Sequence, residues 1–290
     1  MLPKSRSNPK RARGTTLNSK FKTGLIHLAP VLASMLFGTL CGYLILTSSM
    51  ETIQITPFSE GSIGSIGNAA YFVILVGVGA TLLYLLLKRK SHKLITLITG
   101  FAMTSAIFML SMIYLYAAFS SYEIPYIDVF ILAASLLMTI LADYAIFRTN
   151  SKFTNLIILG IGGSLGAFLG FSIPTESALL ILGFLAAYDT FAVYRGPVGK
   201  IARNGLEQFR GLSFSFKNIQ MGLGDLTFYS MLSGHMLIYF GYVSCISSMI
   251  GILAGCLLSF KMLEKKGMFP GLPFPIILGL ATGLLASLLS

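Results

Sequence analysis

The feature that most restricts the fold of this 290-residue chain is a series of apolar segments separated by short polar stretches. Most of these segments are long enough to cross the hydrocarbon core of a bilayer, which takes about 20 residues of α-helix. Only α-helices and closed β-barrels satisfy their backbone hydrogen bonds in lipid, and these segments are too long and too uniformly apolar for barrel strands. The sequence therefore predicts an all-α, multi-pass membrane protein.

Nine membrane helices are expected. The apolar segments fall at about 24–46, 69–87, 94–119, 127–147, 155–173, 177–194, 221–240, 242–260 and 271–289. The seventh and eighth form one run of about 40 residues, twice the length that one crossing needs. We therefore expect this run to fold back, with Gly241 as the turn. Because no soluble domain interrupts the series, residues 24–290 are predicted to form a single domain.

The basic residues are confined to some of the connecting segments. All 21 Lys and Arg fall in residues 1–23 or after the predicted second, fourth, sixth and eighth helices, which places them on one side of the membrane. Since cytoplasmic loops are enriched in Lys and Arg, the N-terminus is predicted to be cytoplasmic and the C-terminus outside. Residues 1–23 carry seven basic residues and no acid, and are predicted to form a disordered arm; an organelle transit peptide is the alternative.

The composition excludes several classes of protein. Charged residues make up 11% of the chain and hydrophobic residues 55%, whereas a soluble domain has about 25% charged residues. A soluble monomer, a disordered protein and a nucleic-acid-binding protein are therefore poor interpretations, despite the net charge of +11. Cys41, Cys245 and Cys256 lie in apolar segments without metal-ligand spacing, so no disulfide framework, metal site or cofactor is expected.

Three acids are predicted to lie inside membrane helices, at Asp143, Asp189 and Asp225. Burying such a residue costs about 2.5–3.5 kcal/mol on insertion scales, so each is a candidate functional position. Counting from the flanking basic residues, Asp189 and Asp225 should lie roughly 9 and 12 Å from the cytoplasmic face. Their helices, about 177–194 and 221–240, are consecutive and antiparallel, so the two carboxylates can meet.

A close pair of carboxyl groups tends to share one proton, because two adjacent negative charges repel each other. One member can then activate a water as a base while the other protonates or polarises a carbonyl as an acid. This arrangement suits peptide hydrolysis without a metal or a covalent intermediate. Gly222, Leu223 and Gly224 precede Asp225, and the two glycines leave bare backbone where water and a substrate chain can approach. Tight helix packing is the alternative explanation for these glycines.

A proline-rich segment, Pro270-Gly271-Leu272-Pro273, opens the last apolar segment, and Pro275 follows it. Proline removes a backbone donor and interrupts regular helix. Irregular backbone at membrane depth is tolerated only against protein or a water-filled cavity, which suggests a site. An ordinary helix start is the alternative, since proline is common at the first helical position.

Three segments together resemble one family. Tyr188-Asp189, Gly222-Leu223-Gly224-Asp225 and Pro270-Gly271-Leu272-Pro273 are similar to the Tyr-Asp, Gly-x-Gly-Asp and Pro-Ala-Leu-Pro motifs of the presenilin and signal peptide peptidase family of intramembrane aspartyl proteases. The order of the motifs and their places on the predicted sixth, seventh and ninth helices agree as well. The resemblance implies an endopeptidase with Asp189 and Asp225 as the catalytic pair and with the other motif residues shaping the site. Gly271 stands where the family usually has alanine.

The resemblance also implies partners and a location. The substrates would be transmembrane helices in the lipid bilayer, with their N-termini outside because the predicted orientation is that of presenilins rather than of the inverted signal peptide peptidases. The long loop insertion of animal presenilins is missing between the predicted sixth and seventh helices. This favours a single uncut chain in the cell membrane of a microbe. No obligate partner subunit is indicated, and homo-oligomerisation, the natural substrate and the cleaved bond stay open.

Other interpretations explain fewer of these residues. A proton-coupled transporter or channel would also use buried aspartates, as an ion relay, whereas a non-catalytic scaffold does not explain two acids at matched depth. Gly162-Gly163-Ser164-Leu165-Gly166 fits the G-x-S-x-G pattern of serine hydrolases but lies within a predicted membrane helix, so it is interpreted as a packing surface. His235 is interpreted as a packed or interfacial residue. Asp143 is expected to have a structural role and to snorkel toward Arg148.

Overall fold

The computed structural model describes residues 24–48, 50, 53–89, 91–122, 125–148, 151–195, 213–216, 219–266 and 268–289. The predicted arm, residues 1–23, lies outside this part of the chain. The described elements are the 3-10 turn η1 (Leu25–Leu28), helices α1 (Ala29–Thr47), α2 (Ser62–Lys88), α3 (His92–Phe119), α4 (Ile127–Arg148), α5 (Ser151–Ser172), α6 (Thr175–Tyr194), strands β1 (Ser213–Phe216) and β2 (Ile219–Gly222), and helices α8 (Leu223–Lys266) and α9 (Pro273–Leu289).

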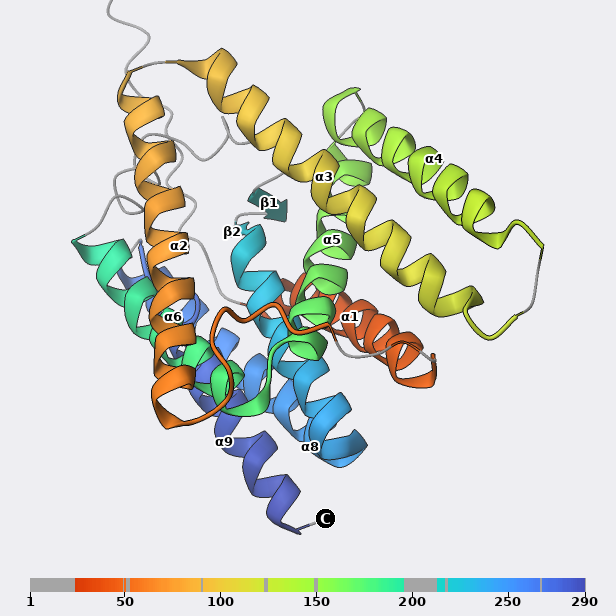
Figure 1. Ribbon diagram of the computed structural model, residues 1–290. Coiled ribbons are helices and arrows are strands. Elements are labelled where there is room, and N and C mark those ends of the chain that lie inside the picture. The colour runs from red at the N-terminus through yellow and green to blue at the C-terminus, as the bar shows by residue number, and fades with distance from the viewer. Residues whose placement is uncertain are drawn as a thin grey trace, which may run out of the picture.

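The helices form a central group with a flank on each side. Helices α1, α5 and α8 pack against one another in the centre and α9 packs against α8, while α2 lies beside α6 on one flank and α3 lies beside α4 on the other (Figure 1). The main hydrophobic core includes Met35 of α1, Ile161 of α5, Leu232 and Ile252 of α8, and Ile276 of α9, and it extends to the flanking helices. Helix α8, whose first turn carries Asp225, therefore contacts each of the other central helices.

Helix α8 folds back on itself at Gly241. The backbone of Gly241 has φ 85° and ψ −178°, which no helix contains. Leu232 and Ile252, on opposite sides of Gly241, both lie next to Gly279 of α9. A straight helix would hold them roughly 30 Å apart, at 1.5 Å per residue. The prediction that this apolar run reverses at Gly241 is therefore confirmed, and glycine is suited to the turn because the positive φ costs it little.

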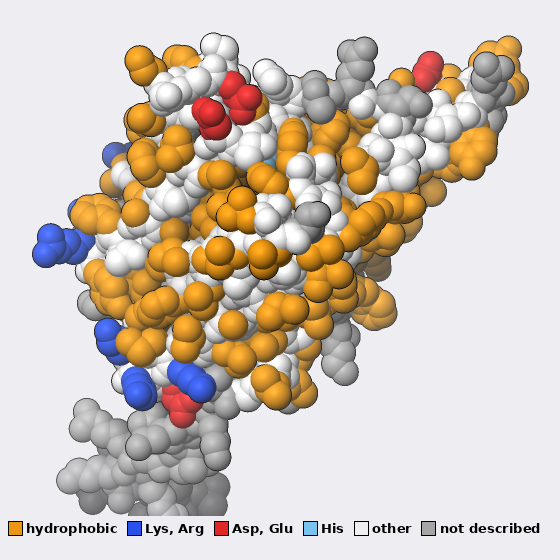
Figure 2. Space-filling view, turned by 90° about the horizontal axis from the view of Figure 1, so that it is seen from below, with side chains coloured by type: hydrophobic (Ala, Val, Ile, Leu, Met, Phe, Trp, Pro, Cys, Tyr) orange, Lys and Arg blue, Asp and Glu red, His pale blue; other side chains and the backbone are white. Residues whose placement is uncertain are grey.

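The described residues contain seven helices that are long and apolar enough to cross a membrane, if the reversed α8 is counted once. Helix α9, with 17 residues, is shorter than these seven. Figure 2 shows one face of the molecule, on which hydrophobic side chains cover most of the surface and charged side chains lie near the margins. The chain is therefore an integral, multi-pass membrane protein, while nine crossings and a cytoplasmic N-terminus stay predictions.

Three acids differ from the other charged side chains of the described residues in being partly buried. All the Lys and Arg side chains that the structure describes are exposed, as are Glu60, Asp128, Glu176 and Glu264. Only Asp143, Asp189 and Asp225 are partly buried among the acids of the described residues. These are the three acids that the sequence places inside membrane helices.

Two short strands are an exception in the otherwise helical fold that the sequence predicts. β1 and β2 pair antiparallel, from Ser213 opposite Gly222 to Phe216 opposite Ile219. The predicted seventh helix, expected from about residue 221, begins instead at Leu223. The prediction relied on hydropathy, which does not distinguish a strand from a helix in a short segment. Here the backbone groups before the helix are satisfied by a hairpin partner, and Gly222 belongs to the strand.

Candidate functional site

Asp189 and Asp225 approach the same peptide unit, the one between Gly271 and Leu272. The Leu272 N–H donates a hydrogen bond of 3.0 Å to Asp189 Oδ2. A Cβ atom built on Gly271 would lie 2.9 Å from Asp225 Oδ2, so the second carboxylate lies directly against the Gly271 backbone. The structure thus brings together α6, the first turn of α8 and the segment before α9, which are the three places that the sequence singled out.

The backbone beside Asp225 is open. A Cβ on Gly222 would meet only Asp225 Oδ2 and the Gly224 nitrogen, at 4.0 and 3.9 Å, and a Cβ on Gly224 would meet only the ring of Phe228, at 3.8 Å. Within the described residues, neither glycine therefore packs against another helix. The alternative explanation, tight helix packing, does not account for them, and the bare backbone remains accessible beside the acid.

The proline segment is both a helix start and part of the site. Pro273 is the first residue of α9, a position at which a backbone N–H would have no partner within the helix, so proline loses no hydrogen bond there. Residues 268–272 are not helical, and Pro270 and Leu272 are buried. The Tyr229 hydroxyl donates a 2.9 Å hydrogen bond to the Gly271 carbonyl. The irregular backbone is thus held by side chains from two other helices, in addition to the first turn of α9.

Comparison with solved structures identifies the architecture. The chain superimposes on structures of a presenilin family intramembrane aspartate protease in the C222 and P2 space groups, with TM-scores of 0.65 and 0.66. The matches cover 91% and 93% of this chain and 99% and 100% of those chains, at 18% and 19% sequence identity. The chain has the presenilin fold. The resemblance that three short motifs suggested therefore extends over almost the whole molecule.

A sequence relative agrees with the presenilin fold over a shorter range. Presenilin-B of Dictyostelium discoideum is 30% identical to this chain over 155 residues. The match covers 49% of this chain, and it spans 32% of that protein's length. No protein-family model matches the sequence.

Two of the predicted site residues face away from the acids in this presenilin fold. The Tyr188 hydroxyl would lie 3.3 Å from a Cβ on Gly77, so the ring packs against α2. Leu223 is buried, with its Cδ1 3.4 Å from a Cβ on Gly162 of α5. These side chains therefore connect the helices that carry Asp189 and Asp225 to their neighbours. Adjacent residues on a helix point about 100° apart, which is why a motif neighbour need not enter the site.

Asp143 is far from the pair along the fold and has its own partner. It lies on α4, on the flank, and accepts a 2.7 Å hydrogen bond from the Thr104 hydroxyl of α3 through Oδ2. Its Oδ1 is buried and has no hydrogen-bond partner in the described part of the chain. The expected snorkelling toward Arg148 is therefore wrong, because the carboxylate turns sideways to the neighbouring helix rather than along its own.

The glycine-rich stretch of α5 packs against α8 and α1. Cβ atoms on Gly166 and Gly170 would lie 2.6 Å from Ser230 Cβ and 2.7 Å from the Met231 oxygen, too close for any side chain. The Ser164 hydroxyl donates to the Ile161 carbonyl at 3.2 Å. These contacts agree with the packing interpretation of the G-x-S-x-G match, and they give its serine no base.

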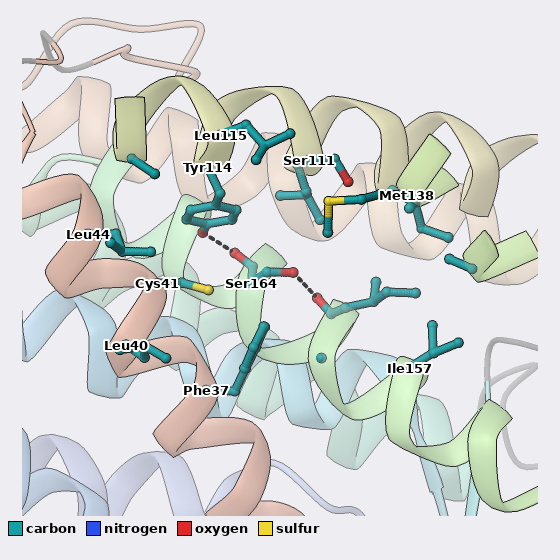
Figure 3. A pocket seen from close by; sticks show the side chains of 16 residues that line it. Phe37, Leu40, Cys41, Leu44, Ser111, Tyr114, Leu115, Met138, Ile157 and Ser164 are labelled. Carbon is teal, nitrogen blue, oxygen red and sulfur yellow. Dashed lines mark hydrogen bonds between the residues drawn. The ribbon is translucent and has the colours of Figure 1, made fainter. Parts of the chain in front are cut away.

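Figure 3 shows the surroundings of Ser164, which borders a cavity of about 450 Å³ between α1, α3, α4 and α5. The lining is almost entirely apolar, and the Tyr114 hydroxyl in it donates to the Ser164 carbonyl at 2.6 Å.

His235 is fully buried, and one of its ring nitrogens is 2.8 Å from the Gly170 carbonyl. The packed role predicted for His235 agrees with this contact.

The site also contains a residue that the sequence did not single out. Tyr229 lies four positions after Asp225 and is only 1% exposed. Residues four apart share a helix face, so the spacing could have indicated a tyrosine beside the acid. Only the tertiary structure shows that its hydroxyl reaches the proline segment.

Proposed function

We propose that this chain is an intramembrane aspartyl endopeptidase that hydrolyses peptide bonds within transmembrane helices. The observation that carries the proposal is the meeting of Asp189 and Asp225 at one peptide unit, in a chain with the presenilin fold. Two carboxyl groups from different helices, both partly buried, would be costly in a membrane without a role.

In the proposed reaction, one aspartate is ionised and the other is protonated, because the pair avoids two adjacent negative charges. The ionised aspartate removes a proton from a water molecule, whose oxygen attacks the substrate carbonyl. The protonated aspartate donates its proton to the carbonyl oxygen. Collapse of the tetrahedral intermediate then breaks the C–N bond, and a proton passes to the leaving amine. Both aspartates are essential, since neither can perform the two roles together.

The substrate helix has to unwind before it can be cut, because the peptide bonds of a helix are shielded. Each unpaired backbone group costs several kcal/mol in lipid, so the unwound segment needs new partners. Strand-like pairing with irregular or extended backbone is one source of such partners. β2 ends at Gly222, immediately before the first turn of α8, and both Gly222 and Gly271 lie beside Asp225 Oδ2. We propose that these two segments bind the extended substrate, with the remaining motif residues, Tyr188, Leu223, Gly224 and Pro273, shaping the site around them.

We further propose nine crossings, a cytoplasmic N-terminus and an outside C-terminus, in the cell membrane of a microbe. The end of α2 and the C-terminus lie at opposite ends of the molecule in Figure 1, as this arrangement requires. Substrates would enter from the bilayer with their N-termini outside. A reporter that is active only outside the cytoplasm, fused to each terminus in turn, should give a signal from the C-terminal fusion alone. A signal from the N-terminal fusion alone would place the chain in the inverted orientation.

A proton-coupled carrier is the other function that buried aspartates could serve. The fold similarity favours a protease. Sealed vesicles containing the protein separate the two functions. A carrier would move solute or protons across the vesicle wall, whereas a protease would convert a labelled transmembrane peptide into two fragments.

The decisive experiment compares cleavage of a labelled type I transmembrane peptide by the purified wild type and its Asp variants, with mass spectrometry of the fragments. Asp189→Asn and Asp225→Asn should each abolish cleavage, and the double variant should be no worse, because residues that act as one unit are not additive. The wild-type rate should fall on both sides of an optimum pH that belongs to the pair. Thermal melting serves as the control for folding, and substantial cleavage by either folded single variant would overturn the mechanism.

A further inference from the structure

One peptide unit connects Tyr229 to Asp189. The Tyr229 hydroxyl donates to the Gly271 carbonyl at 2.9 Å, and the N–H of the same peptide, on Leu272, donates to Asp189 Oδ2 at 3.0 Å. Tyr229 comes from the same helix as Asp225, one turn further on. The helices that carry the two aspartates are therefore joined by two hydrogen bonds that share one peptide unit of the proline segment.

Little else in the local sequence orients this peptide plane. Gly271 has no Cβ and so has the widest range of backbone angles. Neither Pro270 nor Pro273 carries an N–H that could tie the segment down, and residues 268–272 lie outside any helix. The nearest backbone hydrogen bond, from Ile276 to the Leu272 carbonyl at 3.0 Å, holds the next peptide rather than this one. The orientation of the 271–272 peptide thus depends on side chains, with Tyr229 at its oxygen and Asp189 at its nitrogen, and Asp189 also bonds to the Gly271 backbone.

The peptide unit also transmits the effect of the tyrosine. Because the unit is planar and resonance-stabilised, fixing the direction of its C=O fixes the direction of its N–H. A hydrogen bond accepted at the oxygen polarises the unit and strengthens the bond donated by the nitrogen, by an estimated 10–30% per bond. Bonds to a carboxylate are among the strongest that a backbone N–H makes. The tyrosine hydroxyl therefore influences the position of Asp189 without contacting it.

We propose that Tyr229 is a positioning residue for this pair: its hydroxyl holds the 271–272 peptide so that the Leu272 N–H stays on Asp189, which keeps the two aspartates in register. The inference rests on the proposed protease function. The ionisable side chains around the phenol are Asp225 on its own helix, Cys256 on the returning half of α8, and Asp189 on α6. None of the three donates to the Gly271 carbonyl, so none replaces the tyrosine.

The test is Tyr229→Phe, which removes only the hydroxyl. We expect kcat for the labelled peptide to fall by roughly threefold to tenfold and KM to change by less, because the lost bond orients Asp189 through the 271–272 peptide and removes no group that contacts the substrate. A peptide analogue of the tetrahedral intermediate should lose affinity by a similar factor. A purely structural role would not produce this separation between KM, kcat and analogue affinity.

Tyr239→Phe is the matched control. Tyr239 lies on the same half of α8, and its hydroxyl also donates to a backbone carbonyl, that of Phe171, at 3.1 Å, away from the pair. This variant should cleave at the wild-type rate while losing a bond of the same kind. Equal kcat values for folded Tyr229→Phe and Tyr239→Phe would overturn the inference.

The controls separate this inference from the proposed function. If the wild type cleaves, Asp189→Asn does not, and Tyr229→Phe cleaves like the wild type, only the positioning role fails. If Asp189→Asn also cleaves, the protease mechanism fails. Should Tyr229→Phe not fold, 3-fluorotyrosine placed at position 229 keeps the shape and strengthens the donor. A kcat that responds no more to this replacement than to the same replacement at position 239 would again overturn the inference.

Discussion

The glycines of the central helices and of the flank differ in how closely they are packed. Between α8 and α9, a Cβ on Gly255 would lie 2.5 Å from the Pro275 backbone, and a Cβ on Gly279 would lie 2.6 Å from Ile252 Cγ1. On α2, a Cβ on Gly79 would have no atom within 4 Å, and a Cβ on Gly77 would lie 3.3 Å from the Tyr188 hydroxyl of α6. Glycine therefore allows close helix contact in the centre, whereas these two flank glycines meet no backbone of another helix.

This difference in packing indicates how the helices that form the site are held together. Lipid is as apolar as a leucine side chain, so helices in a membrane associate through close packing and hydrogen bonds rather than through the hydrophobic effect. The glycine contacts fix α9 to both halves of α8, and with them the proline segment and Asp225. Large apolar side chains are exposed on the flanks, such as Val78 of α2, Phe101 of α3 and Ile140 of α4, and on the outer faces of the central helices as well. The closest backbone contacts are thus made by the helices that hold the site.

Adding a single methyl group should have its largest effect where α8 contacts α9. Gly255→Ala places a Cβ within 2.6 Å of three backbone atoms of α9, which cannot move independently. We expect a loss of about 2–3 kcal/mol in the free energy of unfolding, and impaired cleavage, because Pro275 belongs to the segment that shapes the site. Gly79→Ala is the control and should lie within about 0.5 kcal/mol of the wild type. Thermal unfolding in detergent measures both, and equal stabilities would contradict the distinction between centre and flank.

A charged side chain should impair cleavage when placed at Leu272, in the site, but not when placed near the far end of α9. Leu272, immediately before α9, is 5% exposed and lies in the segment that both acids approach, whereas Leu288, near the end of α9, is 82% exposed. Leu272→Lys should reduce cleavage at least tenfold, because a cation beside the acids forms an ion pair with them and blocks the substrate segment. Leu288→Lys should leave the rate unchanged. Peptide cleavage at matched amounts of inserted protein checks this, and unimpaired Leu272→Lys would remove the segment from the site.

Gly271→Ala should have a smaller effect, on rate rather than on stability. It introduces the residue that is usual in the family, but its methyl would lie 2.9 Å from Asp225 Oδ2. The carboxylate is at the end of a short side chain and can rotate away, so the fold should persist while cleavage slows by roughly threefold to tenfold. Gly183→Ala on α6 has no atom within 4 Å and serves as the control. A wild-type rate for Gly271→Ala would show that the position of this carboxylate is not critical.

The smallest effect is expected on the flank, at Asp143. Asparagine keeps an oxygen to accept the Thr104 hydrogen bond and is cheaper to bury than a carboxylate. Asp143→Asn should therefore cleave within about twofold of the wild type and melt at a similar temperature. Asp225→Asn, measured beside it, provides the contrasting result. Loss of cleavage in a folded Asp143→Asn variant would mean that the flank contributes to the chemistry.

Much of the architecture and of the candidate site follows from the sequence alone. Segment length and hydropathy predict membrane helices because each crossing satisfies its own backbone, whatever its neighbours are. The apolar run around Gly241 had to reverse because it is twice the thickness of a bilayer. Asp189 and Asp225 were singled out because each is an acid at similar depth on consecutive helices. All of these properties depend on local composition and on the thickness of the membrane.

Only the tertiary structure decided which atoms meet. The rotation of α6 turns Asp189 toward Leu272 and Tyr188 toward α2, and the sideways neighbour of Asp143 is Thr104 rather than a basic helix end. The hairpin before α8 and the reach of Tyr229 to Gly271 are likewise invisible in hydropathy. The reason is that helix rotation and crossing are set by many simultaneous contacts between distant segments, such as the glycine contacts of α5, α8 and α9, and no single stretch of sequence contains them.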